Sequence, residues 1–292
     1  MRSRPEVMRD ERENMRLAVT PRAVSARQDE WRQNTADDHL ATLIDPTSFE
    51  ADRYRILRHV VERNHAKKKL IAVTSALAGE GKTTTAINLA GALSQASDSR
   101  ILISDLDLRT PSLGDRLGLI TQSPGLVDLI LDPTLTLDGV VRRHPRFRLE
   151  VLPAGRPLAA PYELLKSPRL GELLQEARQR YDYVVVDTPP LVPVPDSRLI
   201  ADLVDGLVVV VTAHRTPRTL LEDALTVMEP TKVIGIVFNR DEHPLHGHYG
   251  YSYHGDGDGY YHGRGRRAGW QARDAWGSMS QKILRVLGGL RS

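Results

Sequence analysis

Residues 73–85 read Val-Thr-Ser-Ala-Leu-Ala-Gly-Glu-Gly-Lys-Thr-Thr-Thr, and this stretch decides the fold. An apolar run at 70–73 precedes it, as is typical of a buried strand, and apolar residues with helical spacing follow it at 86–93. A strand, a glycine-rich turn and a helix in this order predict a loop that wraps phosphates. The reason is that backbone N–H groups at a helix N-terminus point toward a bound anion.

The residue types inside this loop match the contacts that a nucleoside triphosphate needs. The glycines let the backbone approach the phosphates, Lys82 supplies charge for the β- and γ-phosphates, and Thr83 supplies a hydroxyl for Mg²⁺. The predicted cofactor-binding residues of the loop are Gly79, Glu80, Gly81, Lys82, Thr83 and Thr84. Ala76 replaces the first glycine of the usual pattern, and the alternative interpretation is a surface turn before an ordinary helix.

Two acidic motifs follow at the ends of later predicted strands. Asp105 and Asp107 stand at the carboxyl end of the strand 100–105, on one side of it because side chains alternate. Asp187 ends the buried run in residues 181–187. Ligands of open α/β sheets bind at this edge, where carboxylates can hold Mg²⁺ and accept a proton from an attacking hydroxyl. The candidate catalytic residues are Lys82, Asp105, Asp107 and Asp187, and the candidate Mg²⁺ ligands are Thr83, Asp105 and Asp187.

The order of the elements predicts an α/β fold with a doubly wound, mainly parallel sheet. Short runs of Val, Ile and Leu alternate with helical patterns, which is typical of strands covered on both faces and joined by right-handed crossovers. The predicted strands are 70–75, 100–105, 149–153, 183–187, 206–212 and 233–239. With the phosphate loop after its first strand, this expected architecture resembles that of the MinD/ParA-like P-loop NTPases.

Composition divides the chain into four predicted segments. Residues 1–45 carry dense mixed charge and are expected to be mobile or weakly helical, and 46–240 form the P-loop domain. Residues 241–268, rich in Gly, His and Tyr, cannot build a core, and 269–292 regain helical spacing.

The overall composition excludes several classes of protein. A net charge of only +3, with basic and acidic residues mixed along the chain, does not indicate nucleic-acid binding. The sequence has no cysteine, which excludes disulfides and thiolate chemistry. The sequence has no apolar run of about 18 residues that could span a membrane. Residues 1–20 lack the apolar core of a secretory signal, so a cytoplasmic location is expected.

The motifs at 79–83 (Gly-Glu-Gly-Lys-Thr), 104–111 (Ser-Asp-Leu-Asp-Leu-Arg-Thr-Pro) and 185–190 (Val-Val-Asp-Thr-Pro-Pro) resemble those of a known family. They are similar to the Walker A, A′ and B elements of the bacterial tyrosine kinases (BY-kinases) of exopolysaccharide and capsule export systems. Further matches stand at 123–130, 152–155 and 161–167, and the resemblance covers about residues 46–261. It implies an ATP-dependent protein-tyrosine autokinase.

The resemblance also implies roles for residues outside these motifs. Asn239 and Arg240, after the last predicted strand, would line the adenine pocket. Asp52, Arg55 and Arg58 match a Glu-x-x-Arg-x-x-Arg helix through which such kinases pack into a homo-oligomeric ring, with Asp in place of Glu. The alternative for this helix is a solvated basic face. The family also needs a membrane-embedded activator, a polysaccharide co-polymerase protein, which would hold this chain at the inner face of the cell membrane.

A tyrosine cluster in the tail supplies the predicted phosphate acceptors. Aromatic residues spaced between glycines cannot form a core, and in the family such a cluster is phosphorylated by a neighbouring subunit. The five tyrosines are Tyr249, Tyr251, Tyr253, Tyr260 and Tyr261. The alternative is a low-complexity tail without modification. Histidines in the same tract make a metal site conceivable, but a glycine-rich tract lacks a preformed ligand geometry.

The last segment, residues 275–290, has apolar positions with helical spacing among basic residues. Such a helix can fold back on the domain, dock on a partner, or make peripheral contact with an anionic membrane.

Two other functions remain as alternatives to the autokinase. The first is a non-kinase ATPase switch like the septum-site and chromosome-partition proteins, which carry a lysine five residues before the phosphate-loop lysine. Leu77 stands at that position here, and the tyrosine tail also favours the kinase. The second is a nucleotide-binding regulatory subunit of a polysaccharide export system.

Overall fold

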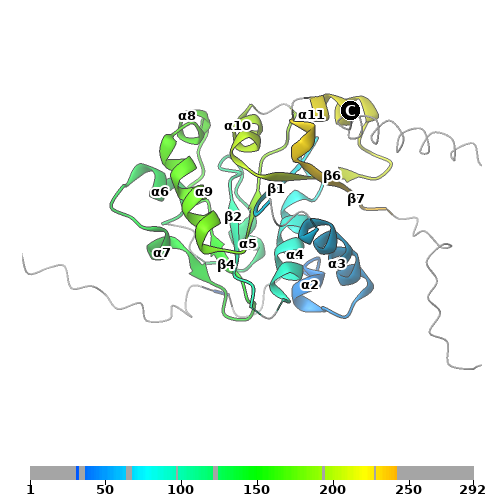
Figure 1. Ribbon diagram of the computed structural model, residues 1–292, viewed down its shortest axis with the longest axis horizontal. Helices are drawn as coiled ribbons and strands as arrows, with labels where there is room; N and C mark the ends of the chain where they lie inside the picture. The colour runs from blue at the N-terminus through cyan, green and yellow to red at the C-terminus, as the bar shows by residue number, and fades with distance from the viewer. Residues whose placement is uncertain are drawn as a thin grey trace, which may run out of the picture.

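The computed structural model describes residues 31–32, 37–63, 68–96, 98–120, 124–192, 195–226 and 228–241. These residues form a seven-stranded sheet with helices packed on both of its faces (Figure 1). The tyrosine cluster at 249–261 and the segment 275–290 lie outside the described residues.

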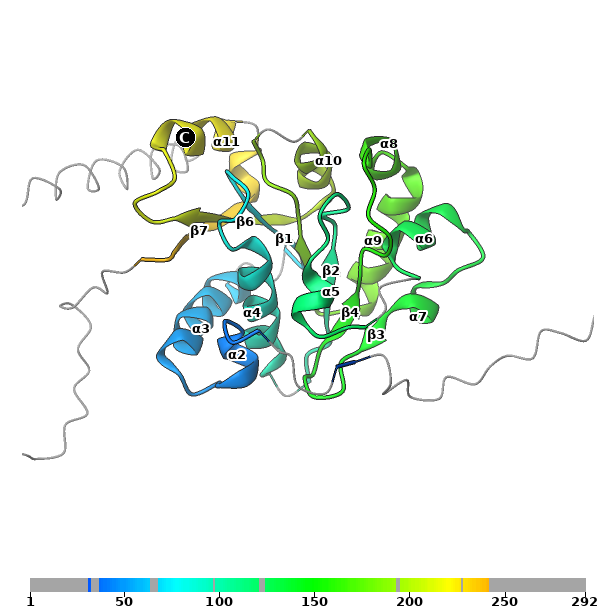
Figure 2. The ribbon, with the colours of Figure 1, turned by 180° about the vertical axis from the view of Figure 1, so that it is seen from behind.

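The sheet has the strand order β3-β4-β2-β5-β1-β6-β7, which confirms the predicted doubly wound topology. Every pairing is parallel except that of β3 with β4, which is antiparallel. The strands are β1 (Leu70–Ser75), β2 (Ile101–Asp105), β3 (Arg142–Arg143), β4 (Glu150–Leu152), β5 (Tyr183–Asp187), β6 (Gly206–Thr212) and β7 (Val233–Asn239). The two-residue strand β3 lies at the edge of the sheet beside β4 (Figure 2) and is too short to leave a pattern in the sequence.

The helices divide between the two faces of the sheet. One face carries α2 (Ala41–Ile44), α3 (Phe49–Glu62), α4 (Lys82–Ser94) and α5 (Leu113–Arg116). The other carries α6 (Leu126–Leu131), α7 (Leu137–Val140), α8 (Tyr162–Leu165), α9 (Pro168–Arg180), α10 (Asp196–Leu203) and α11 (Arg218–Thr226). A 3₁₀ turn, η2 (Pro230–Lys232), leads into β7. None of the described helices is both long and apolar enough to cross a bilayer.

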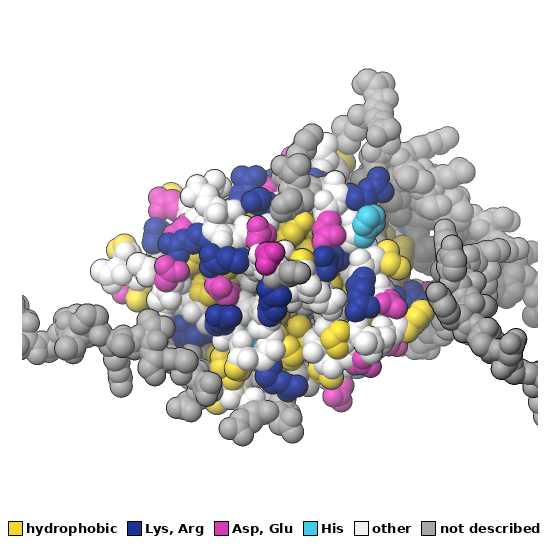
Figure 3. Space-filling view, turned by 60° about the horizontal axis from the view of Figure 1, so that its bottom comes forward, with side chains coloured by type: hydrophobic (Ala, Val, Ile, Leu, Met, Phe, Trp, Pro, Cys, Tyr) yellow, Lys and Arg dark blue, Asp and Glu magenta, His cyan; other side chains and the backbone are white. Residues whose placement is uncertain are grey.

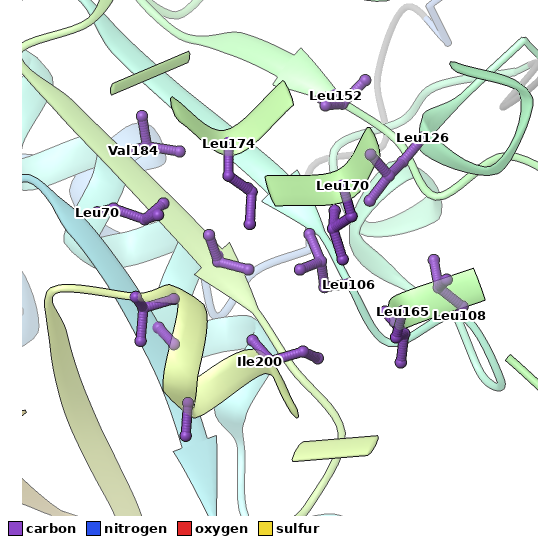
Figure 4. Packing of buried hydrophobic residues seen from close by; sticks show 14 of the residues in the cluster. Leu70, Leu106, Leu108, Leu126, Leu152, Leu165, Leu170, Leu174, Val184 and Ile200 are labelled. Atoms are coloured by element: carbon purple, nitrogen blue, oxygen red, sulfur yellow. The ribbon is translucent and has the colours of Figure 1, made fainter. Parts of the chain in front are cut away.

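Burial on both faces explains why these strands are continuously apolar. Every residue of β1, β2, β5 and β6 is buried. In β1, Leu70 and Ala72 face one core while Ile71 and Val73 face the other. Figure 4 shows the first core, in which leucines of α6, α8 and α9 belong to one cluster with the strand residues Leu70 and Val184. Each buried leucine or valine stabilises the fold by about 1.5–3 kcal/mol, so the central strands hold the site rigidly.

Described residues ahead of position 46, the predicted start of the domain, also pack on it. Trp31 is 6% exposed, forms an isolated antiparallel bridge with Leu119, and lies 4.4 Å from the ring of His144. Leu40 is fully buried. Two apolar anchors among charged residues make no periodic pattern, and for this reason the sequence did not reveal them.

Candidate nucleotide site

The predicted phosphate loop lies between the end of β1 and the start of α4. Gly79 and Gly81 have φ values of +79° and +94°, in the left-handed region that favours glycine. Lys82 begins α4 and is 8% exposed, so its ammonium group is held inside the site. The first N–H groups of a helix have no partners within the helix. The loop therefore presents backbone donors and a cation at one place, as phosphate binding requires.

Thr83 and Asp187 meet at the centre of the site. The Thr83 hydroxyl donates to Asp187 Oδ2 at 2.6 Å and lies 3.0 Å from the Ser112 hydroxyl. Asp187 is 1% exposed, and its other oxygen, Oδ1, is buried without a hydrogen-bond partner among the described residues. An unpaired buried carboxylate oxygen is costly, and Mg²⁺ prefers oxygen ligands, so this pair of residues fits the predicted cation.

The surroundings of Asp187 also change its protonation. Burial raises the pKa of Asp187 to about 6, against the opposing effects of the Thr83 hydroxyl and the Lys82 charge. A metal ion needs the ionised carboxylate, so a proton and a cation compete for this group near neutral pH.

Asp105 is turned toward the backbone of its own loop. The residue is fully buried and stands opposite Asp187 in the register of β2 and β5. Its Oδ2 accepts the N–H groups of Ser112 and Leu113, both at 3.0 Å, and its Oδ1 accepts the N–H of Asp107 at 3.0 Å. Burial, together with the nearby charge of Asp187, raises the pKa of Asp105 well above its usual range.

Asp107 keeps more access to solvent, with 8% of its surface exposed. Its Oδ1 accepts the backbone N–H of Thr110 at 3.1 Å and the hydroxyl of the same residue at 3.2 Å. The structure thus places both predicted carboxylates at the sheet edge, but in different surroundings. Asp105 supports the loop, whereas Asp107 lies nearer its surface; a metal contact by Asp105 stays a prediction.

Two arginines at the site were missed by the sequence analysis. Arg109 lies inside the second motif and pairs with the buried Asp196 of α10 at 2.6 Å. Arg116 pairs with Asp37 at 2.6 Å and reaches the Thr84 hydroxyl at 3.3 Å, and its charge lowers the pKa of Asp187. The motif could have drawn attention to Arg109. Its partner, 87 residues further along the chain, leaves no signal in the sequence.

The two residues predicted for the adenine pocket lie at the end of β7, Asn239 as its last residue and Arg240 directly after it. Asn239 lies against the phosphate loop, where its side-chain amide donates to the carbonyl oxygen of Glu80 at 2.9 Å. A Cβ on Gly81 would come within 2.2 Å of the same amide nitrogen, so the loop needs glycine there. Arg240 is exposed and has a φ of +56°. Their contact with adenine stays a prediction.

The helix predicted to pack between subunits is α3, and its charges have partners within the chain. Arg55 pairs with Asp52 and donates to the carbonyl of Pro46. Arg58 pairs with Glu62 at 2.6 Å and donates to the carbonyl oxygen of Ala92 at 3.0 Å. On the face seen in Figure 3, basic and acidic side chains are interspersed.

The fold and this site define a P-loop nucleotide-binding protein. A glycine-rich loop joins the first central strand to a helix, and an acidic residue ends the neighbouring strand, as nucleotide binding on this fold requires. The family model described as "AAA domain" matches residues 68–216, about half of the chain.

Comparisons with named proteins narrow this class. The chain is 30% identical over 218 residues to "Tyrosine-protein kinase YwqD" of Bacillus subtilis (strain 168), covering 73% of this chain and 90% of the relative. It is 37% identical over 207 residues to "Succinoglycan biosynthesis transport protein ExoP" of Rhizobium meliloti (strain 1021), covering 68% of this chain but only 26% of that protein. The crystal structure of the chimerical protein CapA2B2 superposes with a TM-score of 0.65 at 28% identity, covering 71% of this chain and 92% of that one. The chain belongs to the bacterial tyrosine kinase family.

Proposed function

We propose that this protein is an ATP-dependent protein-tyrosine autokinase. The observation that carries the proposal is the pairing of the Thr83 hydroxyl with Asp187, whose second oxygen accepts no hydrogen bond from the described residues and whose charge interacts with that of Lys82. This arrangement suits Mg·ATP, and the relatives named as tyrosine-protein kinases support phosphoryl transfer to tyrosine. The acceptors would be the tail tyrosines, Tyr249, Tyr251, Tyr253, Tyr260 and Tyr261, modified in trans by a neighbouring subunit.

Each site residue has a role in the proposed mechanism. Lys82 and the loop N–H groups would bind the phosphates, while Thr83 and Asp187 would hold Mg²⁺. The bound ion would neutralise charge that develops on the transferred phosphoryl group. Asp107 accepts the proton of the incoming tyrosine hydroxyl, whose ordinary pKa near 10 makes it a weak nucleophile at neutral pH. We assign this role to Asp107 because Asp105 is fully buried and already accepts three backbone N–H groups.

The proposed setting is regulation of exopolysaccharide or capsule polymerisation and export. One relative is named as a transport protein of succinoglycan biosynthesis, which supports this setting. A separate membrane-embedded activator would recruit the chain to the inner face of the cell membrane, and residues 275–290 would add a peripheral contact. We also propose a homo-oligomeric ring through α3, where Phe49 and Ile56 are 63% and 68% exposed.

The main competing function is an ATPase switch that hydrolyses ATP without modifying protein. In such switches a lysine at the position of Leu77 would reach across a dimer, but here Leu77 packs against the core. The test is to purify the full chain from cells that contain its export system and to measure phosphotyrosine and released phosphate with Mg·ATP. Phosphotyrosine on the chain supports the kinase. Phosphate release with no phosphotyrosine under these conditions supports the switch instead.

A further inference from the structure

Glu80 is the single residue between the two phosphate-loop glycines, and its side chain is buried. Only 4% of its surface is exposed. Its Oε2 accepts the backbone N–H of Leu77 at 2.8 Å, which closes the loop on itself. Its Oε1 accepts the Thr216 hydroxyl and lies 3.4 Å from the backbone nitrogen of Thr212 at the end of β6.

A second connection runs through the backbone of the same residue. The carbonyl oxygen of Glu80 accepts the side-chain amide of Asn239, the last residue of β7. Thr212 stands opposite Asn239 in the register of β6 and β7, and its N–H also donates to the Thr216 hydroxyl at 3.0 Å. Glu80, Thr212, Thr216 and Asn239 therefore form one network, the Glu80 clamp, which ties the phosphate loop to β6, the neighbour of β1, and to β7, the next strand of the sheet.

The clamp has a physical purpose in a loop of this composition. Gly79 and Gly81 have no side chains and adopt left-handed conformations, so they do not hold the loop in one shape. Burying a carboxylate is unfavourable unless donors surround it, and here three donors do so. A loop that is fixed before its ligand arrives loses less conformational entropy on binding.

We propose that Glu80 is a positioning residue for the nucleotide: its carboxylate fixes the phosphate loop in the binding conformation without touching the phosphates. The inference rests on the proposed nucleotide function of this loop and adds to it a role for the Glu80 side chain and for Thr216. A carboxylate is needed because donors approach both of its oxygens. A glutamine could accept on one side only, because its NH₂ group would face a backbone N–H, that of Thr212 or that of Leu77, in either orientation of the amide.

The variants that test the clamp are Glu80→Gln, Thr216→Val and the double variant. Thr216→Val removes one hydroxyl with little change of shape, and Thr216→Ser restores it. Thr226→Val makes the same threonine-to-valine change at an exposed position of α11 and serves as the matched control. The measurements are the dissociation constant of a fluorescent ATP analogue with Mg²⁺, on the full chain, and the melting temperature without nucleotide.

We expect Glu80→Gln and Thr216→Val each to weaken nucleotide binding about tenfold, the size expected for one hydrogen bond to a charged group. The double variant should fall well short of the roughly 100-fold loss that independent effects would give. Thr216→Ser and Thr226→Val should bind as the unchanged protein does. A melting temperature of Thr216→Val close to that of Thr226→Val would show that the effect is on binding.

The outcomes separate this inference from the proposed function. If the unchanged protein does not bind the analogue, or if Lys82→Ala binds it equally well, the nucleotide site itself is wrong. If Lys82→Ala loses binding while Glu80→Gln and Thr216→Val keep it, the clamp is wrong and the site stands. Should Glu80→Gln fail to fold, the comparison of Thr216→Val with Thr216→Ser decides alone: equal affinities overturn the inference.

Discussion

The phosphate loop and the acidic loop after β2 start at the same edge of the sheet, yet they are held in different ways. The phosphate loop is fixed by Glu80, which contacts the ends of β6 and β7 and whose carboxylate takes up one N–H group of the loop, that of Leu77. The acidic loop is fixed from inside, because Asp105 accepts three of its N–H groups. Polar residues at the end of a parallel strand can therefore either bind a ligand or shape the loop that surrounds it.

The largest expected effect tests the phosphate loop. Lys82→Ala should lower tyrosine phosphorylation about 100-fold or more, because a preorganised charge aimed at the phosphates is lost. The melting temperature should change little, because Lys82 is the first residue of α4 and belongs to neither hydrophobic core. Phosphotyrosine detection and thermal unfolding on the same preparation measure the loss of activity and the melting temperature. A folded variant with full phosphorylation would contradict the assigned site.

In the acidic loop after β2, substitution of Asp105 should have the opposite effect to Lys82→Ala: it should lower the stability of the fold. Asp105→Ala should lower the free energy of unfolding by about 3 kcal/mol, because it leaves buried N–H groups without an acceptor. Within the described residues Asp107→Ala removes two hydrogen bonds, both from Thr110, and it should cost about 1 kcal/mol. Urea denaturation of the two variants measures this difference. Equal losses would mean that the two carboxylates do not divide their roles as the structure indicates.

Catalytic activity should also distinguish Asp105 from Asp107, and here we expect the direct catalytic role at Asp107. Asp107→Asn should lower phosphoryl transfer at saturating ATP about 100-fold, the usual contribution of a general base, while ATP affinity falls far less. Single-turnover rates and nucleotide titrations on one preparation give both values. Parallel losses in rate and affinity would show that Asp107 only binds the metal and nucleotide.

The pH dependence of binding tests Asp187, which ends β5 between the two loops. The pKa of Asp187 in the folded protein is about 6, raised from an ordinary 3.8. Between about pH 4 and pH 6 the folded protein therefore holds a proton on Asp187 that the unfolded chain has lost. This group therefore stabilises the nucleotide-free protein below pH 4, and that stability is lost as the pH rises through 6. Because Mg²⁺ requires the ionised form, affinity for Mg·ATP should rise about fivefold from pH 5 to 6 and about tenfold from pH 5 to 7, and it should level off above pH 7.

The control for this prediction is Asp187→Asn, which cannot titrate. Its affinity should be low and the same from pH 5 to 7. If the unchanged protein shows a flat profile, the free oxygen of Asp187 is not where the cation binds.

The smallest expected effect concerns α3, which packs on α4 and so supports the phosphate loop from a distance. Arg55→Ala with Arg58→Ala should cost about 1 kcal/mol or less of stability, because exposed pairs contribute little. In a Lys82→Ala background, which cannot modify itself, the protein should self-associate, and the double substitution should make it monomeric. Light scattering measures this. Assembly equal to that of the parent would place the interface elsewhere.

Much of this architecture follows from the sequence alone, for identifiable reasons. Strands covered on both faces must be apolar throughout, so β1, β5 and β6 were predicted at their observed positions. The meeting of Thr83 and Asp187 was implied by the shared edge of parallel strands.

Contacts between distant residues were not predictable in this way. Thr216 lies 136 residues from Glu80, and nothing in the local pattern indicates that the two hydrogen-bond. The two buried apolar residues ahead of residue 46, Trp31 and Leu40, are isolated from each other in the sequence, so they form no periodic pattern. Asp105 has the residue type and position of a ligand, and only its contacts show that it shapes the loop.

The most direct test of the central claim is to map phosphate on the full chain, purified from its own cells, by mass spectrometry. We expect phosphate on the tail tyrosines at 249–261 and none there in Lys82→Ala. The natural comparison is with Tyr181 and Tyr183, which are 3% and 5% exposed. Burial raises the pKa of both, that of Tyr183 to about 12, so neither should accept phosphate. Phosphate found mainly on Tyr181 or Tyr183, or tail phosphate that persists in Lys82→Ala, would contradict the account.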